Sequence, residues 1–159
     1  MNETISHEYV HGDGHHMLDR KSQLGLAHSA TWHCLLGCGI GEVVGVIIGT
    51  AFGYSNLTTL VLAVALGFVF GFVFGMWPLL RAGFDFSRAL RQVFIAESLS
   101  IVVMETTEVL IQVYTPGVMD AGLGSWIFWL GMAFALTAGY AAAFPVNYVL
   151  VGKGIRHVH

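Results

Sequence analysis

Charged side chains are scarce in this sequence. Asp, Glu, Lys and Arg make up only 11% of its 159 residues, against about 25% in a typical soluble domain. The mean hydropathy is high, at +0.70. These values argue against an ordinary soluble domain and indicate an integral membrane protein, long enough for one domain.

Cysteine is also rare, and the familiar enzyme motifs are missing. Cys34 and Cys38 stand four apart on one expected helix, where two Cα atoms are poorly placed for a disulfide, so we expect free thiols or metal ligands. The sequence contains no P-loop, no G-x-G-x-x-G after a strand, no H-E-x-x-H and no G-x-S-x-G. Residues 1–23 contain no apolar run, so no secretory signal is expected there.

Four apolar segments are present, and they predict four transmembrane helices. Each exceeds the roughly 20 residues that a helix needs to cross the hydrocarbon core. The prediction is an all-α, integral membrane four-helix bundle over residues 28–152, between a polar, histidine-bearing tail at 1–27 and a short tail at 153–159. The four segments run roughly over residues 28–52, 57–80, 90–114 and 124–151.

Basic residues are confined to three places in the chain. They precede the first segment, lie in or near the second loop, or follow the fourth segment, and the other two loops carry none. Four spans place all of them on one side, so the positive-inside rule predicts that both termini of a multi-pass membrane protein are cytoplasmic. The basic residues are Arg20, Lys21, Arg81, Arg88, Arg91, Lys153 and Arg156.

Glycine recurs at every fourth position in the first two segments. Small residues at this spacing let helix backbones approach closely in lipid. We therefore expect tight helix pairing, within or between subunits, although the glycines could serve only to hold the bundle together. Four helices are few to enclose a polar pathway, which favours a homo-oligomer. The glycines are Gly37, Gly41, Gly45 and Gly49, then Gly67, Gly71 and Gly75.

The first segment combines thiols, a histidine and a glutamate. On a helix, Cys34, Cys38 and Glu42 share one face with small residues, so this face is expected to look inward, with His33 beside it. Two thiols on one face suit a soft ion such as Cu(I) or Zn(II), although buried cysteines also serve as small packing residues. The metal site predicted from these residues and the third segment is His33, Cys34, Cys38, Glu42 and Glu97.

Carboxylates line one face of the third segment. Glu97, Glu105 and Glu108 recur at helical spacing, and in a bilayer they must line an aqueous path, bind a cation or stay protonated in hydrogen bonds. Counting residues along the helices places Glu105 near the level of Glu42. Several ion sites at successive depths would give this pattern, and so would one ion site with proton-bearing glutamates beside it. Neutral glutamates that hydrogen-bond one helix to another would give it too. The expected ion or proton path comprises Met104, Glu105, Glu108 and Met132.

Histidines cluster near the start of the chain. Short histidine-rich tracts can capture metal, although a flexible polar tail would look the same. The residues assigned to accessory metal capture are His7, His11, His15 and His16.

Two motifs resemble those of a known family. The chain resembles a family of small prokaryotic four-span membrane proteins known only as a domain of unknown function, over roughly residues 28–152. The resemblance implies the four-span architecture in a prokaryotic inner membrane, and no particular activity. The motifs are Trp32-His33-Cys34-x2-Gly37-Cys38-x2-Gly41-Glu42 and Phe144-Pro145-Val146-Asn147-Tyr148.

The functional prediction is a membrane protein that binds a transition-metal ion, copper before zinc or iron, for transport, storage or delivery. Its expected partners are lipid, the metal ion and further copies of the chain, with no nucleic acid. No catalytic residue is assigned, and an enzyme is the less favoured interpretation. The alternatives are a membrane oxidoreductase or its metal-bearing subunit, and a structural or proton-conducting oligomer without metal.

Overall fold

The computed structural model describes residues 20–153, which form four α-helices and no strand. The predicted all-α, four-helix architecture is thereby confirmed. The helices are α1 (Arg20–Ala51), α2 (Asn56–Arg81), α3 (Phe86–Tyr114) and α4 (Trp126–Gly152).

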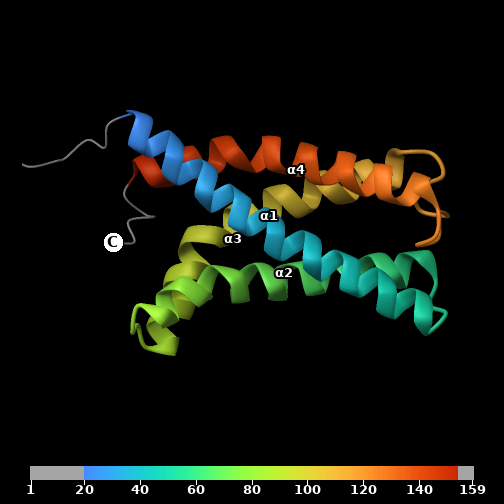
Figure 1. The fold of residues 1–159 in the computed structure, drawn as a ribbon, viewed down its shortest axis with the longest axis horizontal. Coiled ribbons are helices and arrows are strands. Elements are labelled where there is room, and N and C mark those ends of the chain that lie inside the picture. The colour runs from blue at the N-terminus through green and yellow to red at the C-terminus, as the bar shows by residue number, and fades with distance from the viewer. Residues whose placement is uncertain (1–19, 154–159) are drawn as a thin grey trace, which may run out of the picture.

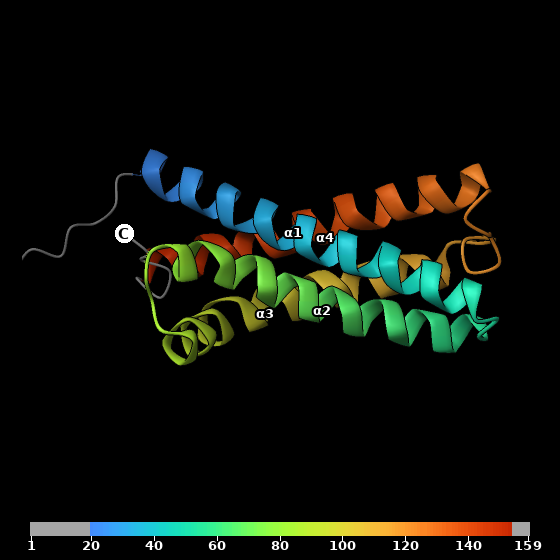
Figure 2. The same cartoon turned by 60° about the horizontal axis from the view of Figure 1, so that its bottom comes forward.

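Successive helices run in opposite directions and pack side by side (Figure 1). Each helix contacts its neighbour in the chain, α4 returns to α1, and α1 also meets α3 across the bundle. The start of α1, the turn at 82–85 and the end of α4 lie at one end, which we call the terminal end (Figure 2). The connections at 52–55 and 115–125 lie at the other, which we call the loop end.

Basic residues gather at the terminal end. Among the described residues, Lys and Arg occur only near the start of α1, at the α2–α3 turn and at the end of α4, and none occurs in the loop-end connections. Arg156 lies outside the described residues. The described basic residues are Arg20, Lys21, Arg81, Arg88, Arg91 and Lys153.

Local signals in the sequence set most helix ends. Ser55, Asp85 and Ser125 cap α2, α3 and α4, because each side chain accepts a hydrogen bond from a backbone N–H in the first turn. Gly53 and Gly83 follow the ends of α1 and α2 with φ of +67° and +85°, a conformation that favours glycine.

Helix α1 begins at Arg20, eight residues before the expected start at residue 28. Its first turns pack on the end of α4: the Gln23 Nε2 donates to the Tyr148 carbonyl oxygen at 2.9 Å, and Ala27 is fully buried. The helix therefore continues beyond the apolar segment that predicted it.

The outer surface of the bundle is apolar and its interior holds polar side chains. Val61, Phe94 and Phe134 are each about 60% exposed, whereas Glu108 and Asn147 are fully buried. Helices α1, α2 and α4 are long and apolar enough to cross a membrane. Helix α3 is not among them, because its three glutamates and two arginines leave too many charged residues in any stretch long enough to cross a membrane.

The glycines of α1 lie against the backbone of α2. A Cβ at Gly41 would come within 2.6 Å of the Gly67 nitrogen, and one at Gly45 within 2.8 Å of the Ala63 nitrogen. The close helix pairing expected from the glycine spacing thus occurs within the chain, between α1 and α2.

Candidate cation site

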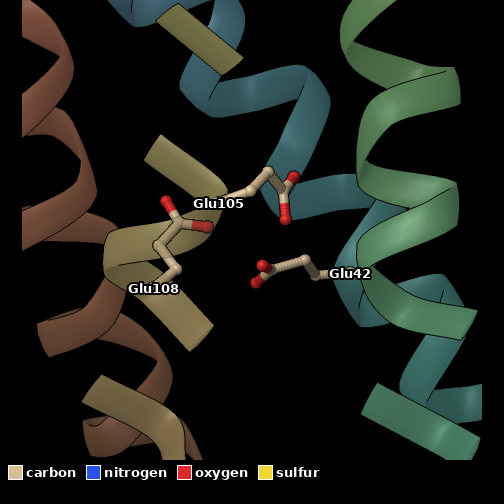
Figure 3. A group of neighbouring side chains, drawn as sticks. All are labelled: Glu42, Glu105 and Glu108. Atoms are coloured by element: carbon tan, nitrogen blue, oxygen red, sulfur yellow. The ribbon is translucent and has the colours of Figure 1, made fainter. Parts of the chain in front are cut away.

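Three glutamates from two helices meet inside the bundle. Glu42 comes from α1, and Glu105 and Glu108 come from α3; their carboxylates point toward one another (Figure 3). One oxygen of each lies within 4.8 Å of an oxygen of the other two. Within residues 20–153 no other group of three His, Cys, Asp or Glu side chains is this compact. We call these three residues the carboxylate cluster.

The fold places the carboxylate cluster where α1 and α3 meet across the bundle, and the other two helices make room for it. Gly67 of α2 lies against the carboxylate of Glu105. A Cβ at Gly139 of α4 would lie 2.8 Å from the Glu108 Cγ. All four helices therefore shape the site. α1 and α3 supply the carboxylates, and α2 and α4 each place a glycine beside one of them.

The cluster is buried and poorly hydrogen-bonded. Glu42, Glu105 and Glu108 are 1%, 2% and 0% exposed, and five of their six carboxylate oxygens have no hydrogen-bond partner. The remaining oxygen, Oε2 of Glu42, accepts a hydrogen bond from Nε2 of Gln112 at 3.5 Å. Buried carboxylates without partners are costly, so this arrangement calls for a cation or for protons among the oxygens.

The donor set fits a divalent metal ion. Carboxylate oxygens bind Zn²⁺ at about 2.0–2.2 Å, which puts neighbouring donors about 3.5 Å apart. Oxygens that already lie within 4.8 Å of one another need only small side-chain adjustments to reach that separation. The same donors also suit harder ions such as Mn²⁺.

The two thiols lie about one turn (Cys38) and two turns (Cys34) before Glu42 on α1, toward the terminal end. Cys34 and Cys38 are free and buried, and they pack in an apolar layer with Ile101, Met104 and Ala143. Both side chains are almost wholly buried, at 1% exposed for Cys34 and 0% for Cys38. The thiols therefore border the carboxylate cluster without belonging to it. Met104 lies in the same apolar layer as the thiols, and we call these five residues the thiol layer.

His33 and Glu97 line a separate hollow. This cavity of about 270 Å³ lies toward the terminal end of the bundle, where residues of all four helices line it, Gln92 among them. The Nδ1 of His33 is 2.7 Å from the Ser29 carbonyl oxygen, and Glu97 lies beside Gly75. The structure thus distributes the five residues of the predicted metal site over three places: the hollow, the thiol layer and the carboxylate cluster.

The other expected site residues fall in two places. Met132 of α4 is buried and lines a cavity at the loop end. The histidines assigned to metal capture lie outside the described residues; they are His7, His11, His15 and His16.

Sequence reasoning did not assign three residues to the site that they help to shape. Gln112 lies one turn beyond Glu108 on the same face of α3, and that helical spacing was the available signal. Gly67 belongs to the glycine series of α2, but its spacing does not reveal that it accommodates a carboxylate. Gly139 belongs to a series of small residues at every fourth position of α4, Gly131, Ala135, Gly139 and Ala143. That spacing was an available signal for close packing, but it does not reveal that Gly139 accommodates a carboxylate.

A second buried polar contact involves one of the family-like motifs. Asn147 Nδ2 donates to Thr31 Oγ1 at 2.7 Å, and Thr31 Oγ1 donates to the Ala27 carbonyl oxygen at 2.7 Å. Both side chains are fully buried. This contact ties α4 to α1 below the thiol layer, toward the terminal end.

These features define a class: a four-helix bundle with an apolar exterior and carboxylates in its interior. The chain belongs to the family described as Domain of unknown function (DUF4396), which matches residues 25–156. The expected resemblance to an uncharacterised family is therefore confirmed. No curated protein and no solved structure matches the chain, so its function has to be inferred from the site.

Proposed function

We propose that this protein is an integral membrane protein that binds a divalent transition-metal ion between Glu42, Glu105 and Glu108, for transport, storage or delivery of that ion. The observation that carries the proposal is the buried carboxylate cluster, with five of its six oxygens lacking partners. A divalent ion would offset two of the three negative charges, and a shared proton or the Gln112 amide would ease the remainder.

The membrane assignment extends to all four helices. Three of them are long and apolar enough to cross a bilayer, and α3 packs between α2 and α4 with its glutamate face turned inward. With α3 as the fourth span, both termini lie on one side. The basic residues at the terminal end make that side cytoplasmic, which suits a prokaryotic inner membrane. Association of several copies stays a prediction.

The chemical type of the donor atoms ranks the candidate metal ions. Hard carboxylate oxygens favour Zn²⁺, Fe²⁺ or Mn²⁺, whereas Cu(I) prefers thiolates. The copper preference inferred from the sequence rested on Cys34 and Cys38, which lie beside the carboxylate cluster. Copper is therefore the second candidate, supported by two free, buried thiols that lie in the same packed layer.

Metal binding by protein in lipid nanodiscs tests the proposal. Titration with Zn²⁺, Mn²⁺, Fe²⁺ and Cu(I), with elemental analysis after desalting, should show about one divalent ion per chain. Glu42→Gln or Glu108→Gln should weaken binding about tenfold or more, because each removes a charged donor. Glu97→Gln is the matched control: it makes the same chemical change outside the cluster and should leave affinity near that of the wild type.

Two other outcomes would redirect the assignment. Binding of Cu(I) that disappears with Cys34→Ser and Cys38→Ser, but survives the glutamate changes, would favour the thiol site. No binding of any of the four ions would leave the carboxylates holding protons, as expected for a proton path or a hydrogen-bonded helix interface.

A further inference from the structure

A cavity of about 280 Å³ lies at the loop end of the bundle. Residues of α1, α2, α3 and α4 and of both loop-end connections line it. Its wall mixes hydroxyl, amide and apolar side chains, which lets it hold water. Its lining includes Thr50, Thr59, Ala63, Gln112, Phe128 and Met132.

Gln112 joins this cavity to the carboxylate cluster. Its side chain is 8% exposed and lines the cavity, while its Nε2 donates to Oε2 of Glu42 at 3.5 Å. It stands one helical turn from Glu108, on the loop side. A single amide therefore lies between the cavity and the nearest carboxylate.

The opposite direction is closed by the thiol layer. Ile101 and Met104 are fully buried there, with Cys38 and Ala143 packed against them. Ile101 precedes Glu105 by one helical turn, and Cys38 precedes Glu42 by one. An ion would have to displace these packed side chains to leave the cluster toward the terminal end.

We propose that water and cations reach the carboxylate cluster from the loop end only, through this cavity, and that Gln112 is the positioning residue at its inner wall. The identity of the cation rests on the proposed function, but the route itself does not. The lining at the loop end supports this direction, because it includes the carboxylate of Asp120, which can attract cations. Asp120 Oδ1 also accepts a hydrogen bond from Asn56 Nδ2 at 2.9 Å, which joins the 115–125 connection to the start of α2.

Thiol labelling tests the route without any metal. Thr59→Cys places a thiol in the cavity wall, and Val61→Cys places one on the outer surface of the same helix, where Val61 is 61% exposed and would face lipid. Cys34 and Cys38 are buried and can remain. A charged, membrane-impermeant methanethiosulfonate should modify the first variant about tenfold faster than the second, because it reacts with hydrated thiolates.

Two further observations complete this test: the side of the membrane from which the reagent reacts, and the residue that carries the adduct. In sealed vesicles the reagent should modify Thr59→Cys only from the side that faces the loop end, as located by peptide mass spectrometry. Labelling from the terminal side, equal labelling of both variants, or no labelling of Thr59→Cys would overturn the proposal.

Metal kinetics test the role of Gln112. With Mn²⁺ as the probe, Gln112→Leu should slow association about tenfold, whereas Val113→Leu, its neighbour on the outer surface, should not. An unchanged association rate in Gln112→Leu would overturn the positioning role. If wild-type protein binds no Mn²⁺ or other ion, the proposed function fails, and the labelling result still decides the route.

Discussion

Each carboxylate of the cluster lies beside a residue that either has no side chain or donates a hydrogen bond to it. Gly67 and Gly139 leave space for Glu105 and Glu108, and Gln112 supplies the one hydrogen bond to Glu42. Burying an isolated carboxylate costs several kcal/mol of folding free energy. Glycines beside a buried carboxylate therefore indicate that the ionised group binds a cation or that its proton is hydrogen-bonded. At the scale of single residues, the site is therefore sensitive to added methyl groups as well as to lost charges.

Gly139→Ala should disturb the site while the bundle still folds. The new Cβ would lie 2.8 Å from the Glu108 Cγ, so that side chain must move. We expect Mn²⁺ or Zn²⁺ affinity to fall about tenfold, with about 1–3 kcal/mol lost in unfolding free energy. Ion titration and unfolding in detergent measure both.

Gly25→Ala is the control for this change. Nothing lies within 4 Å of a Cβ there, and alanine favours a helix over glycine by about 0.5–1 kcal/mol. It should keep full ion affinity and unfold no more easily than the wild type. Equal affinities in Gly139→Ala and Gly25→Ala would contradict the packing role of Gly139.

The hydrogen bond between Asn147 and Thr31 should stabilise the pairing of α4 with α1. A double-mutant cycle with Thr31→Val and Asn147→Leu, read by unfolding in lipid bicelles, isolates their interaction. We expect a coupling of about 0.6 kcal/mol, typical of interhelical hydrogen bonds in membranes. A coupling indistinguishable from zero would mean that this contact contributes no stability.

At the scale of helices, the two glycine series have different roles. Those of α1 bring its backbone onto α2, as Gly41 does at Gly67, whereas Gly75 in α2 makes room for Glu97 of α3. Close backbone contact between α1 and α2 sets how α1 is rotated. That rotation turns Glu42 toward α3 and the carboxylate cluster.

Gly45→Leu should separate α1 from α2 and cause misassembly. A side chain there meets the Ala63 backbone, with the nitrogen 2.8 Å from the Cβ, and backbone cannot move aside cheaply. We expect a large loss of correctly folded protein, measured by size-exclusion chromatography and thermal unfolding. Gly25→Leu, at an open position in the same helix, should behave like the wild type, and equal behaviour of the two variants would refute the contact.

At the scale of the whole molecule, connectivity and charge act together. Four antiparallel helices bring the start of α1, the α2–α3 turn and the end of α4 to one end, where the described basic residues lie (Figure 1). By the positive-inside rule, the terminal end, and with it both termini, faces the cytoplasm in the proposed membrane orientation.

Reporter fusions test that orientation. A reporter fused after Lys153 should be active in the cytoplasm, and one inserted at Gly122, in the loop-end connection, should be active on the other side of the membrane. Paired alkaline phosphatase and fluorescent-protein fusions measure the two locations. A fusion after Lys153 that is active outside the cytoplasm would refute the orientation.

The sequence by itself determined the four helices and the side-by-side placement of Glu105 and Glu108. Apolar length and capping residues are local properties, so they locate helices without knowledge of the fold. Helical spacing likewise puts residues three apart on one face. Counting along the helices also placed Glu105 at the level of Glu42, and the structure brings the two together.

Only the tertiary structure decided which side chains share a site. The sequence grouped Glu42 with Cys34, Cys38, His33 and Glu97, whereas the structure places Glu42 with Glu105 and Glu108. The reason is that a helical face covers a wide arc, and the rotation and crossing of each helix choose which part of that arc meets which neighbour. Here those choices depend on glycine contacts between residues far apart in the chain, such as Gly41 with Gly67. The glycine spacing predicts that such a contact forms, but not which residue is the partner.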